Sequence, residues 1–181
     1  YITPDMRRKA KAVNFGIVYG ISDFSLANDL KITKNQAKEY IKKYLAHYSK
    51  VDEYMRSIVL KARQEGCVKT LFKRVRPIPE ITSTNYNIRS FGERVALNAP
   101  IQGTAADIIK IAMINVYNAL KERNLKSKLI LQVHDELIVN TKKSELKEVM
   151  DIIKTQMEKA ADLSVKLEVS VHYGDNWYDA K

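Results

Sequence analysis

Apolar residues recur along most of this chain with helical spacing, and only a few short stretches alternate as strands do. The first helix has a clear start signal. Thr3 can cap it, Pro4 suits its first position, and Asp5 lies near the positive end of the helix dipole. Gly20 can end it. The sequence therefore predicts a helix over about residues 4–19.

Two more helices are predicted before the middle of the chain. Thr33 and Gln36 form a capping box, in which each side chain can satisfy a backbone donor of the other residue. Apolar and aromatic residues then recur three and four positions apart as far as Tyr48, which indicates a helix with one buried face. The next helix has the same spacing from Val51 and ends at Gly66.

Strand-like stretches appear after this point. CVKTLF, residues 67–72, predicts a strand, and a proline-rich loop follows over 76–85. A long helical pattern then covers about 87–120. Pro100 and Gly103 lie inside it, and we expect them to bend or interrupt the helix.

The last third predicts a hairpin, a helix and a strand. In KLILQVHDELIVN, residues 128–140, two apolar runs flank a polar triplet, as expected for a hairpin with HDE at its turn. Residues 144–161 then predict a helix, and the alternation over 166–174 predicts a final strand. The inward positions of that helix are Leu146, Val149, Ile153 and Met157. The expected fold class is α+β.

The composition adds a basic charge balance to this picture. The 181 residues contain 31 Lys and Arg against 21 Asp and Glu, a formal charge of +10. Such an excess favours a polyanionic partner such as nucleic acid, although a solvated basic surface remains an alternative.

Cellular location is constrained by what the sequence lacks. Cys67 is the single cysteine, so an internal disulfide is excluded, which fits a reducing compartment. No apolar run approaches the ~18 residues of a membrane span. The start, which lacks both a signal-peptide core and an initiator methionine, suggests a piece of a longer chain.

The first helix carries a stripe of unusual composition. Arg7, Lys11, Phe15 and Tyr19 follow one another at intervals of four and cover about 18 Å of helix length. The opposite side is apolar and suits a core; it contains Met6, Ala10, Val13 and Ile17. A triphosphate beside a base would use both cations and aromatics. A surface helix with aromatics packed on a neighbour would show the same pattern.

Two further groups of polar residues could bind ligands. Asp135 and Glu136 are adjacent carboxylates that suit Mg²⁺, although Asp is common in ordinary hairpin turns. His134 has no second histidine or cysteine at zinc spacing. A second group shares one helix face and could donate hydrogen bonds to base edges in a minor groove, or bond locally around Pro100. It consists of Arg94, Asn98 and Gln102.

Three ordered motifs then identify a family. RRKAKAVNFGIVYG resembles the nucleotide-binding motif B of family A DNA polymerases, ERVALNAPIQGTAADIIK resembles the helix that follows the fingers, and QVHDEL resembles motif C. The ending YGDNWYDAK is also similar to the family's C-terminus. The resemblance covers essentially the whole chain. It implies a helical fingers subdomain over 1–86, with its nucleotide-binding helix at about 4–19, and the C-terminal part of an antiparallel palm sheet with packed helices over 87–181.

The resemblance assigns roles to the residues of the stripe. Arg7 and Lys11 would hold the triphosphate of the incoming nucleotide, and Lys11 would also act as general acid toward the leaving pyrophosphate. Phe15 would lie against the sugar and base, and Tyr19 beside the templating pair. Phenylalanine at position 15 implies discrimination against dideoxynucleotides.

The resemblance also implies the cofactor and the partners. Asp135 would be a ligand of two catalytic Mg²⁺ ions, with Glu136 in an accessory role. The substrates would be primer–template DNA and deoxynucleoside triphosphates. The residues expected to contact DNA are Arg94, Asn98, Gln102 and His134. A monomeric bacterial protein of replication or repair is expected, cytoplasmic and associated with the nucleoid rather than with a membrane.

The sequence departs from the family in two places. Lys73 stands where the family usually has glycine, and Val75 interrupts a basic run, which puts the shape of that hairpin in doubt. The motif A stretch DYSQIE, which supplies the second metal-binding aspartate, does not occur, and the thumb and nuclease domains are also missing. We therefore expect this chain to be inactive alone, although its parent is a DNA polymerase.

Two other functions remain as alternatives. A single-subunit RNA polymerase shares the logic of the fingers helix, but its motif C usually lacks the glutamate, and Phe15 also favours the DNA enzyme. A non-catalytic nucleic-acid-binding module would have little use for Asp135 and Lys11.

Overall fold

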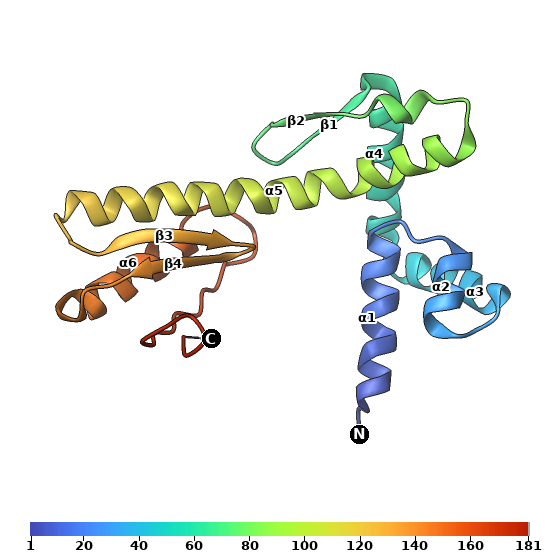
Figure 1. The fold of residues 1–181 in the computed structure, drawn as a ribbon. Helices are drawn as coiled ribbons and strands as arrows, with labels where there is room; N and C mark the ends of the chain where they lie inside the picture. Colours follow the sequence, from blue (N-terminus) through green and yellow to red (C-terminus); the bar gives the residue numbers. More distant parts are fainter. Residues whose placement is uncertain (181) are drawn as a thin grey trace. The chain divides into compact units, whose positions relative to one another are not determined.

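The computed structural model describes residues 1–180, which form two compact units (Figure 1). The first unit ends at Thr104, and the second begins at Ala105. Each contains helices and a two-stranded antiparallel sheet, which confirms the α+β class. The division between fingers and palm at residue 86 stays a prediction, because compactness does not test it.

The first helix, α1 (Pro4–Val18), begins as predicted. The Thr3 hydroxyl accepts a hydrogen bond of 3.2 Å from the backbone N–H of Met6. Tyr19 caps the other end, and Gly20 follows with φ of +75°. A left-handed residue directly after a helix reverses the chain with little strain when it is glycine.

Three more helices follow in the first unit: α2 (Asp23–Leu30), α3 (Lys34–His47) and α4 (Ser49–Glu65). The capping box of Thr33 and Gln36 is present. The sequence pattern did not predict α2, although Ser22 caps it with its hydroxyl. A core between α1, α2 and α3 explains its stability; its buried members are Leu26, Ala27, Leu30 and Ala37.

The expected strand over 67–72 is shorter than predicted, because the chain turns within it. Strand β1 (Cys67–Lys69) pairs with β2 (Val75–Pro77), which was not predicted, and the short helix η1 (Pro79–Thr82) follows. Lys73 occupies the turn with φ of +65°. The glycine usual in the family would fit this conformation, so lysine preserves the turn at the cost of some backbone strain.

The long helix α5 (Tyr86–Glu122) is continuous through Pro100 and Gly103, so an interruption there was wrong, while the bend that was expected as the alternative stays a prediction. Asn85 supports its start, since its side-chain oxygen accepts a bond of 2.9 Å from Asn87 N–H. Pro100 removes only one backbone hydrogen bond. Buried residues on both sides hold the helix, among them Ala96 before the proline and Ala112 after it.

The second unit contains the predicted hairpin and helix. Strand β3 (Lys128–Val133) pairs with β4 (Glu136–Asn140), and the short helix η2 (Lys143–Glu145) leads into α6 (Leu146–Glu158). A register shift near Ile130 interrupts the alternation of β3 and leaves that side chain 59% exposed. The core lies between α5, the hairpin and α6, and its buried members are Val116, Leu120, Val149 and Ile152.

The predicted final strand is wrong. Residues 166–174 form no strand with any other described part of the chain. Their backbone is anchored instead by a side chain, since Val169 N–H donates to the Glu158 carboxylate at 3.3 Å. Alternation therefore predicted an extended backbone without predicting a partner for it.

Within residues 1–180, no helix combines the length and the apolar character that crossing a membrane requires.

Candidate functional site

The predicted stripe on α1 is exposed along its whole length. Arg7 and Lys11 face solvent, and Phe15 and Tyr19 are 51% and 38% exposed. The Lys11 Nζ lies 5.8 Å from the centre of the Phe15 ring, and the centres of the Phe15 and Tyr19 rings are 6.1 Å apart. The helix thus presents two cations and two adjacent rings on one accessible surface.

The opposite face of α1 packs only in its second half. Ile17 is buried and Val13 is half-buried against the core of α2 and α3, but Met6 is 56% exposed and Ala10 is also exposed. The prediction that all four positions join the core was therefore wrong for the first two. Helical spacing identifies a face, whereas the neighbouring elements decide how much of it is covered.

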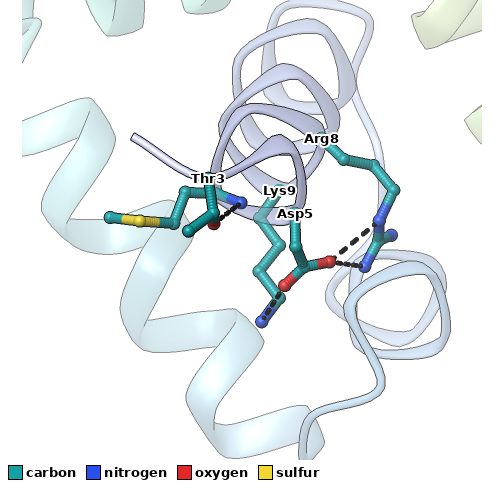
Figure 2. A network of polar contacts seen from close by, with 5 residues as sticks. Thr3, Asp5, Arg8 and Lys9 are labelled. Atoms are coloured by element: carbon teal, nitrogen blue, oxygen red, sulfur yellow. Dashed lines mark hydrogen bonds and ion pairs between the residues drawn. The ribbon is translucent and has the colours of Figure 1, made fainter. Parts of the chain in front are cut away.

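One carboxylate controls the pairing of cations at the start of α1 (Figure 2). Asp5 accepts hydrogen bonds from Arg8 Nε at 3.1 Å and Nη2 at 2.7 Å, and it pairs with Lys9 Nζ at 2.8 Å. Hydrogen bonds from Lys9 and then Arg8 hold the pKa of Asp5 below its usual value. In the described residues, no carboxylate pairs with Arg7 or Lys11, so the two cations of the stripe remain available for an anion.

The first unit also contains an open groove of about 660 Å³ between α5 and the β1–β2 hairpin. Three residues that were predicted to share a helix face line it together: Arg94, Asn98 and Gln102. Arg74 and Arg76 line it from the hairpin, and their role was not foreseen. The basic run around Val75 was the only signal in the sequence, and nothing in it indicated a facing helix.

Two further observations concern the groove: one side-chain atom in it lacks a hydrogen-bond partner among the described residues, and its helix lies close to the end of α1. The side-chain oxygen of Asn98 is buried and has no hydrogen-bond partner among the described residues. Such an atom calls for an explanation, and a bound donor would provide one. Gly20, which follows the stripe, lies against α5: a Cβ there would stand 3.4 Å from Arg94 Cγ. The end of the stripe and the start of the groove are therefore neighbours.

The acidic turn of the second unit is a tight two-residue connection. Val133 pairs with Glu136, and His134 between them has φ of +51°. Gln132 Nε2 donates to the His134 carbonyl at 2.7 Å. Because the turn lies beyond the packed part of the hairpin, the side chains of His134, Asp135 and Glu136 are all exposed.

The carboxylates of this turn fit one edge of a magnesium site. Mg²⁺ takes one or two protein carboxylates together with water and substrate phosphates, and Asp135 and Glu136 offer such oxygens. No group of three or more His, Cys, Asp or Glu side chains that could enclose a metal ion occurs within residues 1–180. The second aspartate expected of this family has no counterpart in the described chain. His134 and the two carboxylates belong to the second unit, and the stripe and groove to the first.

Comparisons with known proteins agree with the motifs. The family model for DNA polymerase family A matches residues 1–179. DNA polymerase I of Caldicellulosiruptor bescii is 56% identical over 180 residues, which are 99% of this chain and 21% of that protein. DNA polymerase I of Geobacillus stearothermophilus is 53% identical, over 99% of this chain and 20% of that protein. The chain thus spans about a fifth of the length of these curated relatives.

A solved structure matches the whole fold as well. It is described as the POL domain of Pol1 from M. smegmatis in complex with DNA primer-template and dNTP. The TM-score is 0.94 at 45% sequence identity, and the match covers 99% of this chain and 32% of that one.

Proposed function

Because the chain belongs to DNA polymerase family A, we propose that its residues supply the fingers and the C-terminal part of the palm of a DNA-directed DNA polymerase. The substrates are primer–template DNA and deoxynucleoside triphosphates, and the process served is replication or repair. The observation that carries this proposal is the exposed stripe of α1. Its cations Arg7 and Lys11 have no carboxylate partner within residues 1–180, and they stand beside the exposed rings of Phe15 and Tyr19.

The stripe binds the incoming nucleotide. The Arg7 guanidinium holds phosphate oxygens through its planar fork, and the Lys11 ammonium adds a point charge. Phe15 lies against the sugar and base, and Tyr19 packs beside the templating pair, as flat apolar surfaces that stack well. Asp5 forms ion pairs with Arg8 and Lys9, so within the described residues the unpaired positive charges of α1 are those of the stripe.

The reaction is attack of the primer 3′-oxygen on the α-phosphate: the 3′-hydroxyl proton passes to water, the new O–P bond forms, and the bond from the α-phosphate to the leaving pyrophosphate breaks. Lys11 donates a proton to the leaving oxygen, which prevents its full negative charge from developing. Asp135 would hold Mg²⁺ in the complete enzyme, with Glu136 in an accessory role beside it. The bound metal would supply positive charge that stabilises the negative charge developing on the reacting phosphate.

The groove contacts DNA near the primer terminus. Arg94, Asn98 and Gln102 donate hydrogen bonds, and every base pair presents minor-groove acceptors at the same places. Guanine adds a donor there, which the unpartnered oxygen of Asn98 can accept. His134 contacts the template or primer from the hairpin turn. The matches to DNA polymerases favour this function over a single-subunit RNA polymerase.

Lys11→Ala in the full-length polymerase tests the role of the stripe. General acid catalysis contributes about 100-fold or more, so nucleotide incorporation should fall by at least that factor. Lys9→Ala is the matched control, since Lys9 lies on the same helix but is already paired with Asp5. If Lys11→Ala weakened DNA binding and left nucleotide incorporation unchanged, the proposed role of Lys11 would be wrong.

The isolated chain provides a second test. We propose that it is inactive alone, because the described residues supply a single aspartate at the metal position, and that the full-length enzyme acts as a monomer on nucleoid DNA in the bacterial cytoplasm. Primer extension with Mg²⁺ should give no product with this chain and clear product with the full-length protein. Robust extension by the chain alone would mean that another carboxylate replaces the missing ligand.

A further inference from the structure

A glycine in the middle of α5 indicates that another element approaches the helix closely. Alanine is the better helix former, so Gly103 is not explained by helix stability. A Cβ at this position would stand only 2.7 Å from Thr70 Cγ2, in the turn of the β1–β2 hairpin. The absence of a side chain at Gly103 is what allows the turn to touch the helix.

Thr70 has little freedom to move out of the way. It is only 9% exposed, and its hydroxyl accepts a hydrogen bond of 3.1 Å from Arg74 N–H. The backbone N–H of Thr70 also donates to the Arg74 carbonyl at 3.0 Å. Rotating the Thr70 side chain would break the first of these bonds, so its methyl group is held against Gly103.

Two further hydrogen bonds fix the turn to the same part of α5. Leu71 N–H donates to the Thr104 hydroxyl at 2.9 Å, and Arg74 Nη2 donates to the Gly103 carbonyl at 3.0 Å. These contacts lie directly beside Gln102, which lines the groove. The turn is therefore bonded to α5 at Gly103, directly next to Gln102, whose side chain is proposed to contact DNA.

We propose that this contact, made by Thr70 and Arg74 with Gly103, positions the groove residues so that the polymerase distinguishes a paired from a mispaired primer terminus. The inference rests on the proposed function. Gln102 and Asn98 stand on the helix, and Arg76 stands on the hairpin across the groove. Donors on two walls can test the shape of a base pair only when the distance between the walls is fixed. Thr70, Arg74 and Gly103 are positioning residues, since none needs to touch the reacting atoms.

The test compares Gly103→Ala with a designed suppressor in the full-length protein. Thr70→Ser removes the Cγ2 methyl that a new Cβ would meet and keeps the hydroxyl that binds Arg74. Gly92→Ala is the matched control, because it adds the same methyl to the same helix. There the clash is with the backbone of Glu80 and Ile81 at 2.9 Å, which Thr70→Ser cannot relieve.

The main readout is the ratio of kcat/KM for extension of a matched primer terminus to that of a mispaired one. Gly103→Ala should lower this ratio by on the order of tenfold, because small displacements near a reacting centre have large effects on rate. The KM for the nucleotide on a matched terminus should change less than about twofold, since the stripe is untouched. Adding Thr70→Ser to Gly103→Ala should restore the ratio.

A second variant guards against a protein that fails to fold. Thr104→Val removes the acceptor of Leu71 N–H without adding volume, and it should lower the same ratio by a smaller factor. An unchanged ratio in the folded variants would overturn the inference. So would an equal effect of Gly92→Ala, or a Gly103→Ala defect that Thr70→Ser leaves in place. A full-length protein that extends no primer at all would instead refute the proposed function.

Discussion

The two hairpins of this chain both reverse direction at a residue with positive φ, but the turn of one is packed on a helix and the turn of the other is exposed. Each has one non-glycine residue with positive φ at its turn, Lys73 in the first and His134 in the second. The turn of the first is docked on α5 through Leu71 and Arg74. The turn of the second is exposed, and Gln132 in its own strand holds it.

The difference matches the two proposed roles, positioning of the groove for the first turn and ligand binding for the second. A turn that is bonded to a helix can set the width of a groove, but its own backbone has few groups left for a ligand. A turn that is held from within its own hairpin keeps Asp135 and Glu136 accessible. A positive φ at the turn thus occurs both in a hairpin whose turn is bonded to a helix and in one whose turn is exposed.

The largest expected effect concerns the exposed turn. Asp135→Asn in the full-length polymerase should reduce primer extension on the order of 1,000-fold, because metal ions supply several kcal/mol of charge stabilisation. Since Asp135 is exposed, the free energy of unfolding should change by less than about 0.5 kcal/mol. Asp151→Asn, at an exposed position of α6, is the control and should extend primers normally. Normal extension by Asp135→Asn would exclude the metal role.

A smaller effect should distinguish how the two turns are held. Thr104→Val removes two hydrogen bonds, the one from Leu71 N–H and the one to the Pro100 carbonyl, and should lower the free energy of unfolding by about 1–2 kcal/mol. Gln132→Met removes the donor to the His134 carbonyl, but this turn is exposed and water can replace the donor. Gln132→Met should therefore change the free energy of unfolding by close to zero. Urea unfolding monitors both variants, and equal losses would contradict the distinction between the two hairpins.

The two strained residues offer a matched pair of substitutions. Lys73→Gly and His134→Gly should each raise the free energy of unfolding by up to about 1 kcal/mol, since glycine avoids the cost of left-handed backbone. Only His134→Gly should also lower primer extension, because His134 is proposed to contact DNA. Lys69→Gly, within strand β1, is the control and should lower stability. Thermal unfolding and extension assays measure the two properties separately.

The smallest expected effect is a pH dependence of the free energy of unfolding that comes from Glu145, beside the start of the second hairpin. Glu145 accepts hydrogen bonds from the Ser127 hydroxyl at 2.6 Å and from the backbone N–H groups of Lys126 and Ser127. The Ser127 hydroxyl foremost lowers the pKa of Glu145 from its usual 4.5. Because the folded-state pKa is the lower one, this stabilisation is present above pH 4.5 and is lost as the pH falls through the folded-state pKa.

Glu145→Gln should remove that dependence. The variant should be less stable than the parent at neutral pH and should lose less stability on acidification below about pH 4.5. Unfolding midpoints measured over a series of acidic buffers would show this. Parallel curves for the parent and the variant would exclude the carboxylate as the cause. The turn of the first hairpin is held by backbone, hydroxyl and guanidinium groups, which do not titrate between about pH 3 and 7. Thr104→Val should therefore leave the pH dependence of the unfolding midpoint unchanged.

The sequence by itself determined the features that depend on neighbours along the chain. The cap at Thr3, the box of Thr33 and Gln36 and the helix end at Gly66 are local, because their bonds span only a few residues. The stripe on α1 follows from helical spacing alone. The hairpin over 128–140 follows from two apolar runs around a polar triplet, although only His134 and Asp135 form its turn and Glu136 already belongs to β4. The motifs of the family could be identified for the same reason, as each is continuous in sequence.

The tertiary structure decided what depends on residues far apart in the chain. Strand β2 and the shortened β1 exist because they pair with each other, and α5 continues through Pro100 because packing on both sides outweighs one lost bond. Apolar and polar residues alternate over 166–174, but this segment forms no strand with any other described part of the chain, because alternation does not determine which other segment it would pair with. The groove and the contact of Thr70 with Gly103 required the fold itself, because the two residues lie 33 positions apart in the sequence.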